Sequence, residues 1–526
     1  MKLGMIAVAL GLVVAAAPRP ALAQDRAFTL LHTNDMHGRH TPFPVAPGDA
    51  TAQTGDPGRD PAQFDRAAMI GGFAYLASAI ENVRRKVGPD SVLLVDGGDT
   101  FSDDLVGNAT RGEAMIRLMN AVGYRFMALG NHDFDYGLDR TRELQAIADF
   151  PMRGANALMD GEPIFGRPWE LFEVGGVRVA VLALSYHNTG ETGSKANTRG
   201  VTFTNGIDAA RAFLPQMREA AEVVVVLSHQ GTAVDREMAR QIPDIDLIVA
   251  AHSHDRIDPP ERVNGVWIAQ AVSDAAALGE LTVTVDADGE VSAVEGKVTD
   301  LWNDRIDPDP RIAALVSDLD GPHRARLDEV LATAYDRIGR QYKSESPFDV
   351  LVGDLMRERT GADIAFMPGV GYGVSITPGP VTRDRLVTLL PHPTRMVTLR
   401  LTGAQVLSIL EQSATNLGPE DVFDRVGGLV QTSGIGWTFD LNRPAGRRVS
   451  DVTIDGRAIE ADRLYLAATN VGMLEGLHRY AAFAQGQDTQ VHDVSVTQVV
   501  EEGMVRRGVL TAPAMGRIRR IGPVAR

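Results

Sequence analysis

In the first half of this chain, short runs of β-forming apolar residues each end in a polar motif, most of them flanked by glycine. The motifs are Asp35-Met36-His37-Gly38, Gly98-Asp99, Gly130-Asn131-His132-Asp133, Ser228-His229 and His252-Ser253-His254. Five of the eight histidines between His32 and His254 lie in them. Ligands of α/β proteins bind at the carboxyl ends of the strands, where loops distant in sequence meet. The pattern therefore predicts an α/β fold whose strand tips gather metal-binding side chains.

Strands and helices alternate from Phe28 to about Leu301, which is typical of an α/β domain. We expect strands at residues 28–31, 92–95, 126–129, 177–184, 223–227 and 247–250, and helices at 114–122 and 209–221. A loop rich in Pro, Gly, Asp and Ala spans residues 42–61. Its length and polarity indicate a surface excursion or a flap at the entrance of a site.

The pattern breaks near residue 305, at Asp307-Pro308-Asp309-Pro310. Residues 312–334 are expected to be helical with an interruption at Gly321-Pro322. A second α/β pattern follows, with a helix at 351–359 and strands at 396–401, 436–441 and 464–468. We expect a catalytic domain over residues 24–305, a linker helix over 306–343 and a smaller C-terminal domain over 344–526.

The first 23 residues have the features of a secretory leader: Lys2, an apolar run over residues 3–17 and the small-residue end Ala21-Leu22-Ala23. The run is short for a membrane span, so we expect cleavage before Gln24, a periplasmic or secreted protein and no membrane anchor. A chain of 526 residues with a net charge of −16 indicates several domains and argues against a nucleic-acid partner. The absence of cysteine excludes disulfides.

The residue types of the motifs fit two neighbouring divalent ions, which can clamp the attacking and leaving oxygens of a displacement. Candidate ligands are Asp35, His37, Asp99, Asn131, His229, His252 and His254. The amide oxygen of Asn131 is a suitable neutral ligand for a hard cation. His132 is expected to face the substrate and to donate a proton, with Asp133 orienting its ring. The alternative for Asp133 is a cap on the following segment.

These motifs resemble those of the calcineurin-like metallophosphoesterases, and their order with a large C-terminal domain resembles the secreted 5′-nucleotidase family. The resemblance implies a four-layer sandwich followed by a second, smaller α/β domain. It implies that Asp35, His37 and His254 hold one ion, that Asp99 bridges, and that Asn131, His229 and His252 hold the other. His132 and Asp133 would form the catalytic dyad, and metal-bound water or hydroxide would attack phosphorus in line.

The C-terminal half departs from the motifs of that family. The stretch from Ala365 to Tyr372 lacks the usual Arg, His392 replaces a Phe, and Gly436 stands where Arg is frequent. Val471-Gly472-Met473-Leu474 replaces an aromatic residue and a Gly-Gly-Asp-Gly turn. Tyr372, Arg383, Arg395 and Trp437 are the substitutes that the sequence offers for substrate contacts. For Trp437 the alternative is a packed strand residue, and for the two arginines a solvated face.

The sequence therefore predicts a monomeric two-metal hydrolase of small phosphate esters, with nucleotides favoured as 5′-nucleotidase, UDP-sugar hydrolase or 2′,3′-cyclic phosphodiesterase substrates. Mn, Zn, Fe and Co all suit the mixed Asp, Asn and His ligands. One alternative is a thiosulfohydrolase of bacterial sulfur oxidation, because those enzymes resemble the same family. The other is a catalytically silent ligand-binding protein.

Overall fold

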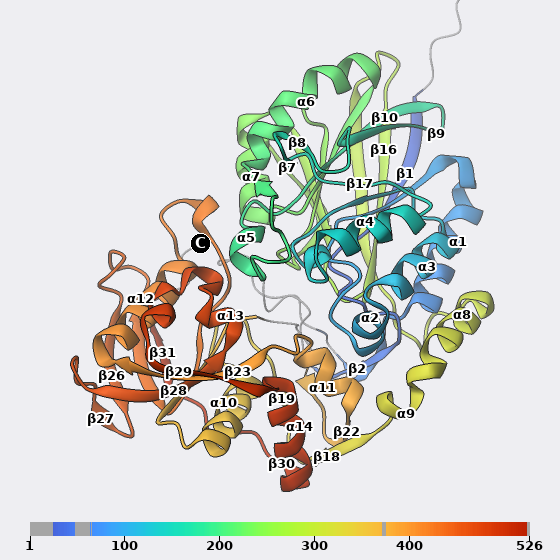
Figure 1. The fold of residues 1–526 in the computed structure, drawn as a ribbon. Helices are drawn as coiled ribbons and strands as arrows, with labels where there is room; N and C mark the ends of the chain where they lie inside the picture. Colours follow the sequence, from blue (N-terminus) through green and yellow to red (C-terminus); the bar gives the residue numbers. More distant parts are fainter. Residues whose placement is uncertain (1–24, 48–63, 65, 371–374, 523–526) are drawn as a thin grey trace, which may run out of the picture.

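A computed structural model describes residues 25–47, 64, 66–370 and 375–522 of the chain. The predicted leader, most of the 42–61 loop and Tyr372 lie outside the described residues. The chain forms an N-terminal domain built on two six-stranded sheets and a C-terminal domain built on smaller sheets, which lie side by side in Figure 1.

The two large sheets account for the apolar runs of the sequence. One has the order β17 (Val291–Asp300), β16 (Ala277–Val285), β1 (Arg26–Thr33), β4 (Val92–Asp96), β5 (Phe126–Ala128) and β6 (Met152–Arg153). The other has the order β14 (Arg256–Val263), β15 (Val266–Ala271), β13 (Leu247–Ala250), β12 (Val223–Ser228), β10 (Val177–Leu184) and β9 (Trp169–Val174). The strands β1, β4, β5 and β6 are parallel, as are β10, β12, β13 and β15. All six strands expected from the sequence are confirmed.

The sheets pack face to face and helices cover both outer faces. The central core joins residues such as Leu30 and Val95 of the first sheet to Val181 and Val225 of the second. Helices α1 (Phe73–Val87), α2 (Leu105–Thr110), α3 (Glu113–Val122) and α4 (Leu138–Ile147) cover the first sheet, and α6 (Gly206–Ala220) and α7 (Thr232–Gln241) cover the second. Central strands buried on both faces need continuous apolar sequence, as in Val223–Ser228, whose six residues are all buried. The expected four-layer sandwich is confirmed.

The segment after the sandwich differs from the single linker helix predicted. It contains α8 (Pro310–Asp320), a turn at Gly321–His323 and α9 (Arg324–Leu327). Asp309 caps α8 by accepting from two backbone N–H groups. The predicted helix is wrong from Val330 onward, because Val330–Ala334 forms β18 between β22 (Gly379–Thr382) and β30 (Val509–Leu510). The partners of this strand lie about 50 and 180 residues away, so local propensity does not reveal it.

The C-terminal domain has a five-stranded sheet, a four-stranded sheet and three main helices. The first sheet has the order β24 (Gln431–Ser433), β20 (Ile364–Met367), β28 (Leu464–Asn470), β23 (Arg395–Thr402) and β29 (Gln487–Ser495). The second has the order β27 (Arg457–Ala458), β26 (Val449–Ile454), β25 (Ile435–Asp440) and β31 (Ile518–Ile521). The helices are α10 (Pro347–Thr360), α12 (Gly403–Leu417) and α14 (Val496–Arg507). The helix and three strands expected here from the sequence are confirmed.

Several short helices and strands complete the two domains. They are α5 (Thr189–Thr192), α11 (Arg383–Leu389), α13 (Val471–Leu474), β7 (Ala157–Met159), β8 (Glu162–Pro163), β11 (Thr202–Phe203), β19 (Ile338–Gly339) and β21 (Ser375–Ile376). At the start of the 42–61 loop, β2 (Phe43–Val45) pairs with β3 (Ala68–Ile70). Phe43 and Trp302 belong to the same buried cluster as Phe348 of α10, so apolar contact joins the domains. Within the described ranges, no helix combines the length and apolar character that a membrane span requires.

Candidate active site

The polar motifs meet at one edge of the sandwich, as the strand pattern predicts. Asp35 and His37 follow β1, Asp99 follows β4, Asn131 follows β5, His229 follows β12, and His252 and His254 follow β13. Two groups of metal-binding atoms result, one from Asp35, His37 and His254 and one from Asp99, His229 and His252, each within 4.8 Å. Asp99 also lies within that distance of His37 and His132, which places it between the groups.

In the first group, two imidazole nitrogens face each other. His37 Nε2 and His254 Nε2 are 3.1 Å apart, and Asp35 Oδ1 is 3.4 Å from His254 Nε2. The other nitrogen of His37, Nδ1, lies 2.8 Å from Asp103 Oδ2. A carboxylate at Nδ1 fixes the ring and leaves Nε2 for a metal, the arrangement found around metal-binding histidines. These donors fit a divalent ion.

In the second group, buried acceptor atoms need a partner. His229 Nδ1 lies 2.7 Å from the Gly97 carbonyl, which leaves its Nε2 facing Asp99 Oδ2 at 3.0 Å. The Asn131 amide oxygen is buried, and no group in the described ranges donates to it. Buried polar atoms in native proteins are nearly always satisfied. A cation bound by Asn131, Asp99 and His229 would satisfy these atoms.

Charge around the two groups keeps the carboxylates ionised. Burial alone would raise the pKa of Asp99, but the imidazoles of His229 and His132 outweigh it and lower that pKa. The pKa of Asp35 is likewise lowered by His254 and His229 against the effect of burial. Ionised carboxylates are the form that binds metal ions.

The backbone at the strand tips is held in an uncommon conformation. Asp35, His37, Asp99, His252 and His254 all have φ between 49° and 71°. Such left-handed residues are rare outside glycine and concentrate at functional sites. Glycine is required at Gly130, because a Cβ there would lie 2.2 Å from Asp99 Oδ1 and 2.6 Å from His229 Cε1.

The structure separates the roles expected for His132 and Asp133. The Asp133 carboxylate accepts from the backbone N–H groups of Asp99, Thr100 and Gly130, at 2.8 to 2.9 Å. It therefore fastens two strand-tip turns together, which corrects the expectation that it orients His132. The orienting carboxylate belongs to Asp135, whose Oδ2 is 2.8 Å from His132 Nδ1. In the sequence Gly-Asn-His-Asp-Phe-Asp, the signal for this role was the position of Asp135 three residues after His132.

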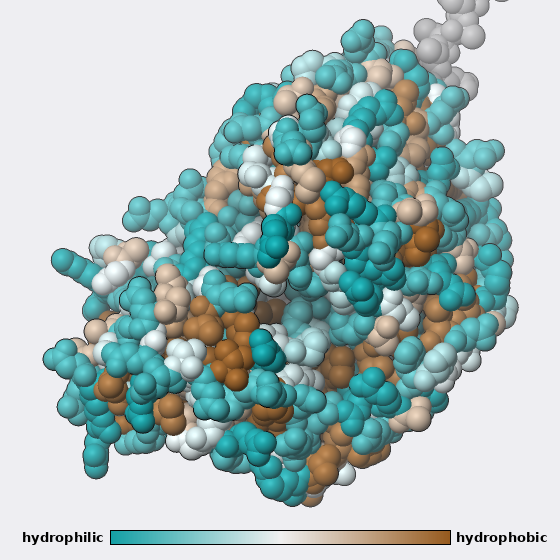
Figure 2. Space-filling view, in the orientation of Figure 1, coloured by the Kyte–Doolittle hydropathy of each residue, from teal (hydrophilic) through white to brown (hydrophobic). Residues whose placement is uncertain are grey.

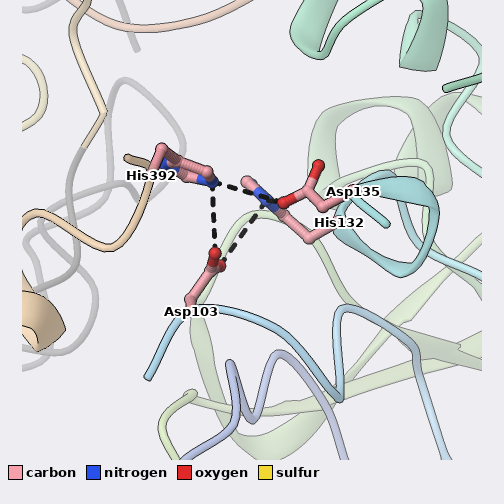
Figure 3. Close-up of side chains that lie close together, drawn as sticks. All are labelled: Asp103, His132, Asp135 and His392. Carbon is pink, nitrogen blue, oxygen red and sulfur yellow. Dashed lines mark hydrogen bonds and ion pairs between the residues drawn. The ribbon is translucent and has the colours of Figure 1, made fainter. Parts of the chain in front are cut away.

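Two further residues beside His132 were not predicted from the sequence. The Asp103 carboxylate lies 3.5 Å from His132 Nδ1, and His392, from the C-terminal domain, stacks on the His132 ring at 5.4 Å. Figure 3 shows the carboxylates of Asp103 and Asp135 beside both imidazoles. The sequence signals for these two residues were the Asp103-Asp104 pair just after the Gly98-Asp99 motif and the His392 that stands in place of a Phe.

The two metal groups open into a pocket of about 480 Å³ between the domains, where Figure 2 shows a hollow in the surface. The N-terminal domain lines it with five of the candidate ligands, His132 and the end of α5, and the C-terminal domain with the 390–395 loop and α13. The five are His37, Asp99, Asn131, His252 and His254. Arg395 lines this pocket, is exposed, and has no side-chain partner in the part of the chain that the structure describes. Its guanidinium is available to a negatively charged ligand.

The other substrate-contact candidates do not reach the pocket or cannot be placed. Trp437 is 2% exposed in the C-terminal core, where its indole N–H donates to Thr432. Arg383 forms ion pairs with Glu329 and Glu501. Trp437 is therefore the packed strand residue of the alternative, whereas Arg383 is a partly buried, ion-paired residue and neither lines the pocket nor lies on a solvated face. Tyr372 lies outside the described residues.

Comparisons with known proteins match both domains. Residues 28–256 match the family model of the calcineurin-like phosphoesterases, and residues 327–485 match that of the 5′-nucleotidase C-terminal domain. Protein UshA of Yersinia enterocolitica is 26% identical over 90% of this chain and 91% of its own length. The trifunctional nucleotide phosphoesterase YfkN of Bacillus subtilis is 26% identical over 87% of this chain, which spans only 34% of that longer protein.

Solved structures share the whole two-domain fold. The 5′-nucleotidase precursor of Thermus thermophilus superposes with a TM-score of 0.84 and 26% identity, covering 94% of this chain and 99% of that one. The sulfate thiohydrolase SoxB of the same organism has a TM-score of 0.85 at 24% identity, with 96% and 98% covered, and shows the fold alone. The chain belongs to the 5′-nucleotidase family of metal-dependent phosphoester hydrolases, in which a calcineurin-like phosphoesterase domain precedes a 5′-nucleotidase C-terminal domain.

Proposed function

We propose that this protein is a secreted two-metal phosphoesterase that hydrolyses nucleotides. The observation that carries the proposal is that seven donor side chains, Asp99 among them, meet at the tips of five strands, and that five of these side chains line a pocket shared by both domains. The nucleotide substrate is supported by the nucleotide phosphoesterase YfkN and the 5′-nucleotidase precursor of Thermus thermophilus, and secretion by the leader-like residues 1–23.

Each ion would have its own ligands and would share Asp99. Asp35, His37 and His254 would hold the first, and Asn131, His229 and His252 the second. Mn, Zn, Fe and Co all remain compatible with this mixture of carboxylate, amide and imidazole donors. When bound, two such ions lower the pKa of coordinated water and neutralise charge on the phosphoryl group.

His132 would protonate the leaving oxygen. Its Nδ1 is engaged by Asp135 at 2.8 Å, so Nε2 is the nitrogen available to the substrate. Burial alone would lower the pKa of His132, but the carboxylates of Asp103, Asp135 and Asp99 raise it well above the ordinary value. A protonated imidazole can donate to an alkoxide as the bond to phosphorus breaks.

Arg395 would bind a negatively charged part of the substrate away from the reacting phosphorus. The guanidinium lines the pocket on the C-terminal side and has no counter-charge among the described side chains. Arginine suits phosphate because its planar N–H groups can form two parallel hydrogen bonds. This assignment would supply one positive group in a domain that lacks the usual arginine of the 365–372 stretch.

Hydrolysis by the mature protein loaded with Mn²⁺ tests the proposal. The substrates are AMP, UDP-glucose, 2′,3′-cyclic AMP and bis-p-nitrophenyl phosphate, each run beside the Asp99→Ala variant. The proposal is supported if the wild type hydrolyses a nucleotide rapidly and the Asp99→Ala variant does not. Hydrolysis of the aryl ester alone would retain the metal site but reject the nucleotide substrate, and release of sulfate from a protein-bound cysteine S-thiosulfonate would favour the thiosulfohydrolase alternative.

A further inference from the structure

The C-terminal domain reaches the catalytic histidine through one short loop. This loop runs from Pro391 to the start of β23 at Arg395 and carries His392 and Arg395 into the same pocket. The N-terminal domain holds the loop from outside, because the Asn108 side chain of α2 donates to the Pro391 carbonyl at 3.1 Å. Tyr136 in turn donates to the Asn108 amide oxygen at 2.9 Å.

The His392 ring completes an alternating arrangement of two imidazoles and two carboxylates. Its Nε2 lies 3.1 Å from Asp103 Oδ1 and 3.2 Å from Asp135 Oδ2. The same carboxylates lie 3.5 Å and 2.8 Å from His132 Nδ1. The two rings are stacked, with 27° between their planes. Each carboxylate therefore contacts one histidine of each domain.

Asp103 occupies its place at a conformational cost. It is an aspartate with φ of 89°, a region that side-chain-bearing residues seldom adopt, and it is 3% exposed. Strained residues persist where surrounding contacts hold them. Here the contacts come from His37, His132 and His392, so the carboxylate joins a proposed metal ligand, the proposed proton donor and the C-terminal domain.

We propose that His392 is a positioning residue that fixes the ring of His132 when the C-terminal domain is seated. With His392 in place, Asp103 and Asp135 each contact a second imidazole, and His132 Nδ1 has one short contact, to Asp135. Without it, two carboxylates compete for a single Nδ1 donor, and the ring loses the stacked face that limits its rotation. This inference rests on the proposed role of His132 as proton donor.

Two substrates with different leaving groups distinguish a role through His132 from a purely structural role of His392. A structural role would change kcat for both substrates alike. p-Nitrophenolate departs without protonation, whereas an alkoxide such as that of a nucleoside needs a proton. We expect His392→Phe, which keeps a ring but no N–H, to lower kcat for AMP on the order of 10-fold or more while changing p-nitrophenyl phosphate by less than about 2-fold. His392→Gln, which keeps one donor, should recover part of the AMP rate.

A double-mutant comparison shows whether His392 acts through His132. The His132→Ala/His392→Phe protein should be no slower on AMP than His132→Ala alone. His492→Phe is a matched control, because His492 lies in β29 and contacts Thr398 outside the pocket. Equal losses on both esters, or full additivity in the double variant, would overturn the proposal.

A spectroscopic measurement separates this inference from the proposed function. In protein labelled with ¹⁵N-histidine, the His132 ring signals are assigned with His132→Gln and compared between wild type and His392→Phe, with metal content measured in each. We expect the Nδ1 signal of His132 to move or broaden in the variant even in the absence of turnover. An unchanged signal rejects the inference, whereas a wild-type protein that hydrolyses neither ester rejects the proposed function instead.

Discussion

The ring of Tyr186 stacks on the imidazole of His252, with centroids 3.8 Å apart and 27° between the planes. The Tyr186 hydroxyl also donates to the Arg425 carbonyl of the C-terminal domain at 2.8 Å. A proposed metal ligand is therefore braced by a side chain that also bonds to the opposite domain. Stacked aromatic pairs contribute roughly 0.5–1.5 kcal/mol beyond the apolar area they bury.

Tyr186→Leu should weaken binding of the second ion by about 2- to 10-fold, because His252 loses its stacked partner. Tyr186→Phe keeps the ring and removes only the hydroxyl, so its metal affinity should match that of the wild type. Titration of the metal-free protein with Mn²⁺, followed calorimetrically, measures both. Equal weakening in the two variants would assign the effect to the hydrogen bond with Arg425 instead.

Substitution of Asp133 should lower the stability of the fold, whereas substitution of Asp135 should lower the rate of turnover. Asp133→Ala leaves three buried backbone N–H groups without an acceptor, so the free energy of unfolding should fall by about 3 kcal/mol or more. Asp135→Ala removes the partner of His132 Nδ1 and should lower kcat with little change in the unfolding midpoint. Urea unfolding and turnover of AMP, measured on both proteins, distinguish the roles. A stable but inactive Asp133→Ala protein would restore the pairing expected from the sequence.

The sequence predicted the meeting of the strand-tip side chains because the position of each depends on local information. A buried strand followed by Asp, Asn or His predicts a polar side chain at the carboxyl edge of the sheet, wherever the strand lies in that sheet. The contacts of His392 and Tyr186 depend instead on how the domains dock, since the carboxylate of Asp135 lies 257 residues from the His392 ring that it binds. The strand β18 was misread for a similar reason, because Val330–Ala334 gains its partners only in the folded C-terminal domain.

Asp103 should control metal affinity through His37. Asp103→Asn removes the charge beside His37 Nδ1, and changes of this kind around metal-binding histidines typically weaken binding 10- to 100-fold. Asp103→Gly should weaken metal binding similarly, but it should also remove the backbone strain of a side-chain-bearing residue at φ of 89°. Metal titration combined with thermal unfolding of the metal-free proteins tests both points. If both variants bound Mn²⁺ as the wild type does, the Asp103–His37 contact would have no role at the metal site.

His32 should make the fold sensitive to acid. It is 1% exposed in β1, neither ring nitrogen has a hydrogen-bond partner among the described residues, and burial lowers its pKa to about 4. The unfolded chain takes up this proton near pH 6.5 and the folded chain only near pH 4, so stability falls as the pH drops through that interval. The loss amounts to about 3 kcal/mol.

His32→Leu isolates this contribution from that of the carboxylates, which titrate in the same region. The difference in unfolding free energy between the wild type and the variant should be constant above about pH 7. As the pH falls from there to about 4, the variant should become more stable relative to the wild type. Urea unfolding at a series of pH values provides the comparison. Parallel pH profiles for the two proteins would show that His32 is already protonated, or solvated, in the native state.

Any rotation of the C-terminal domain should leave the linker helix in place. Helix α8 is fastened to the N-terminal domain by buried Ile312 and Leu319, and Arg311 donates to the Ala121 carbonyl at 3.0 Å. Its end is held by His40, whose Nε2 lies 2.6 Å from Asp320 Oδ1. The segment free to turn therefore begins after α9, near Asp328, which lies within the linker expected over residues 306–343.

The absence of cysteine makes this prediction accessible to site-specific labels. We expect the distance between fluorophores at Asp139→Cys and Asp318→Cys to stay constant when metal and a non-hydrolysable AMP analogue are added. Asp139→Cys with Asp462→Cys reports on the C-terminal domain, because Asp462 is exposed in the turn before β28. A ligand-dependent change in the first pair would place the pivot before α8, since only a displaced linker helix can move that label relative to the sandwich.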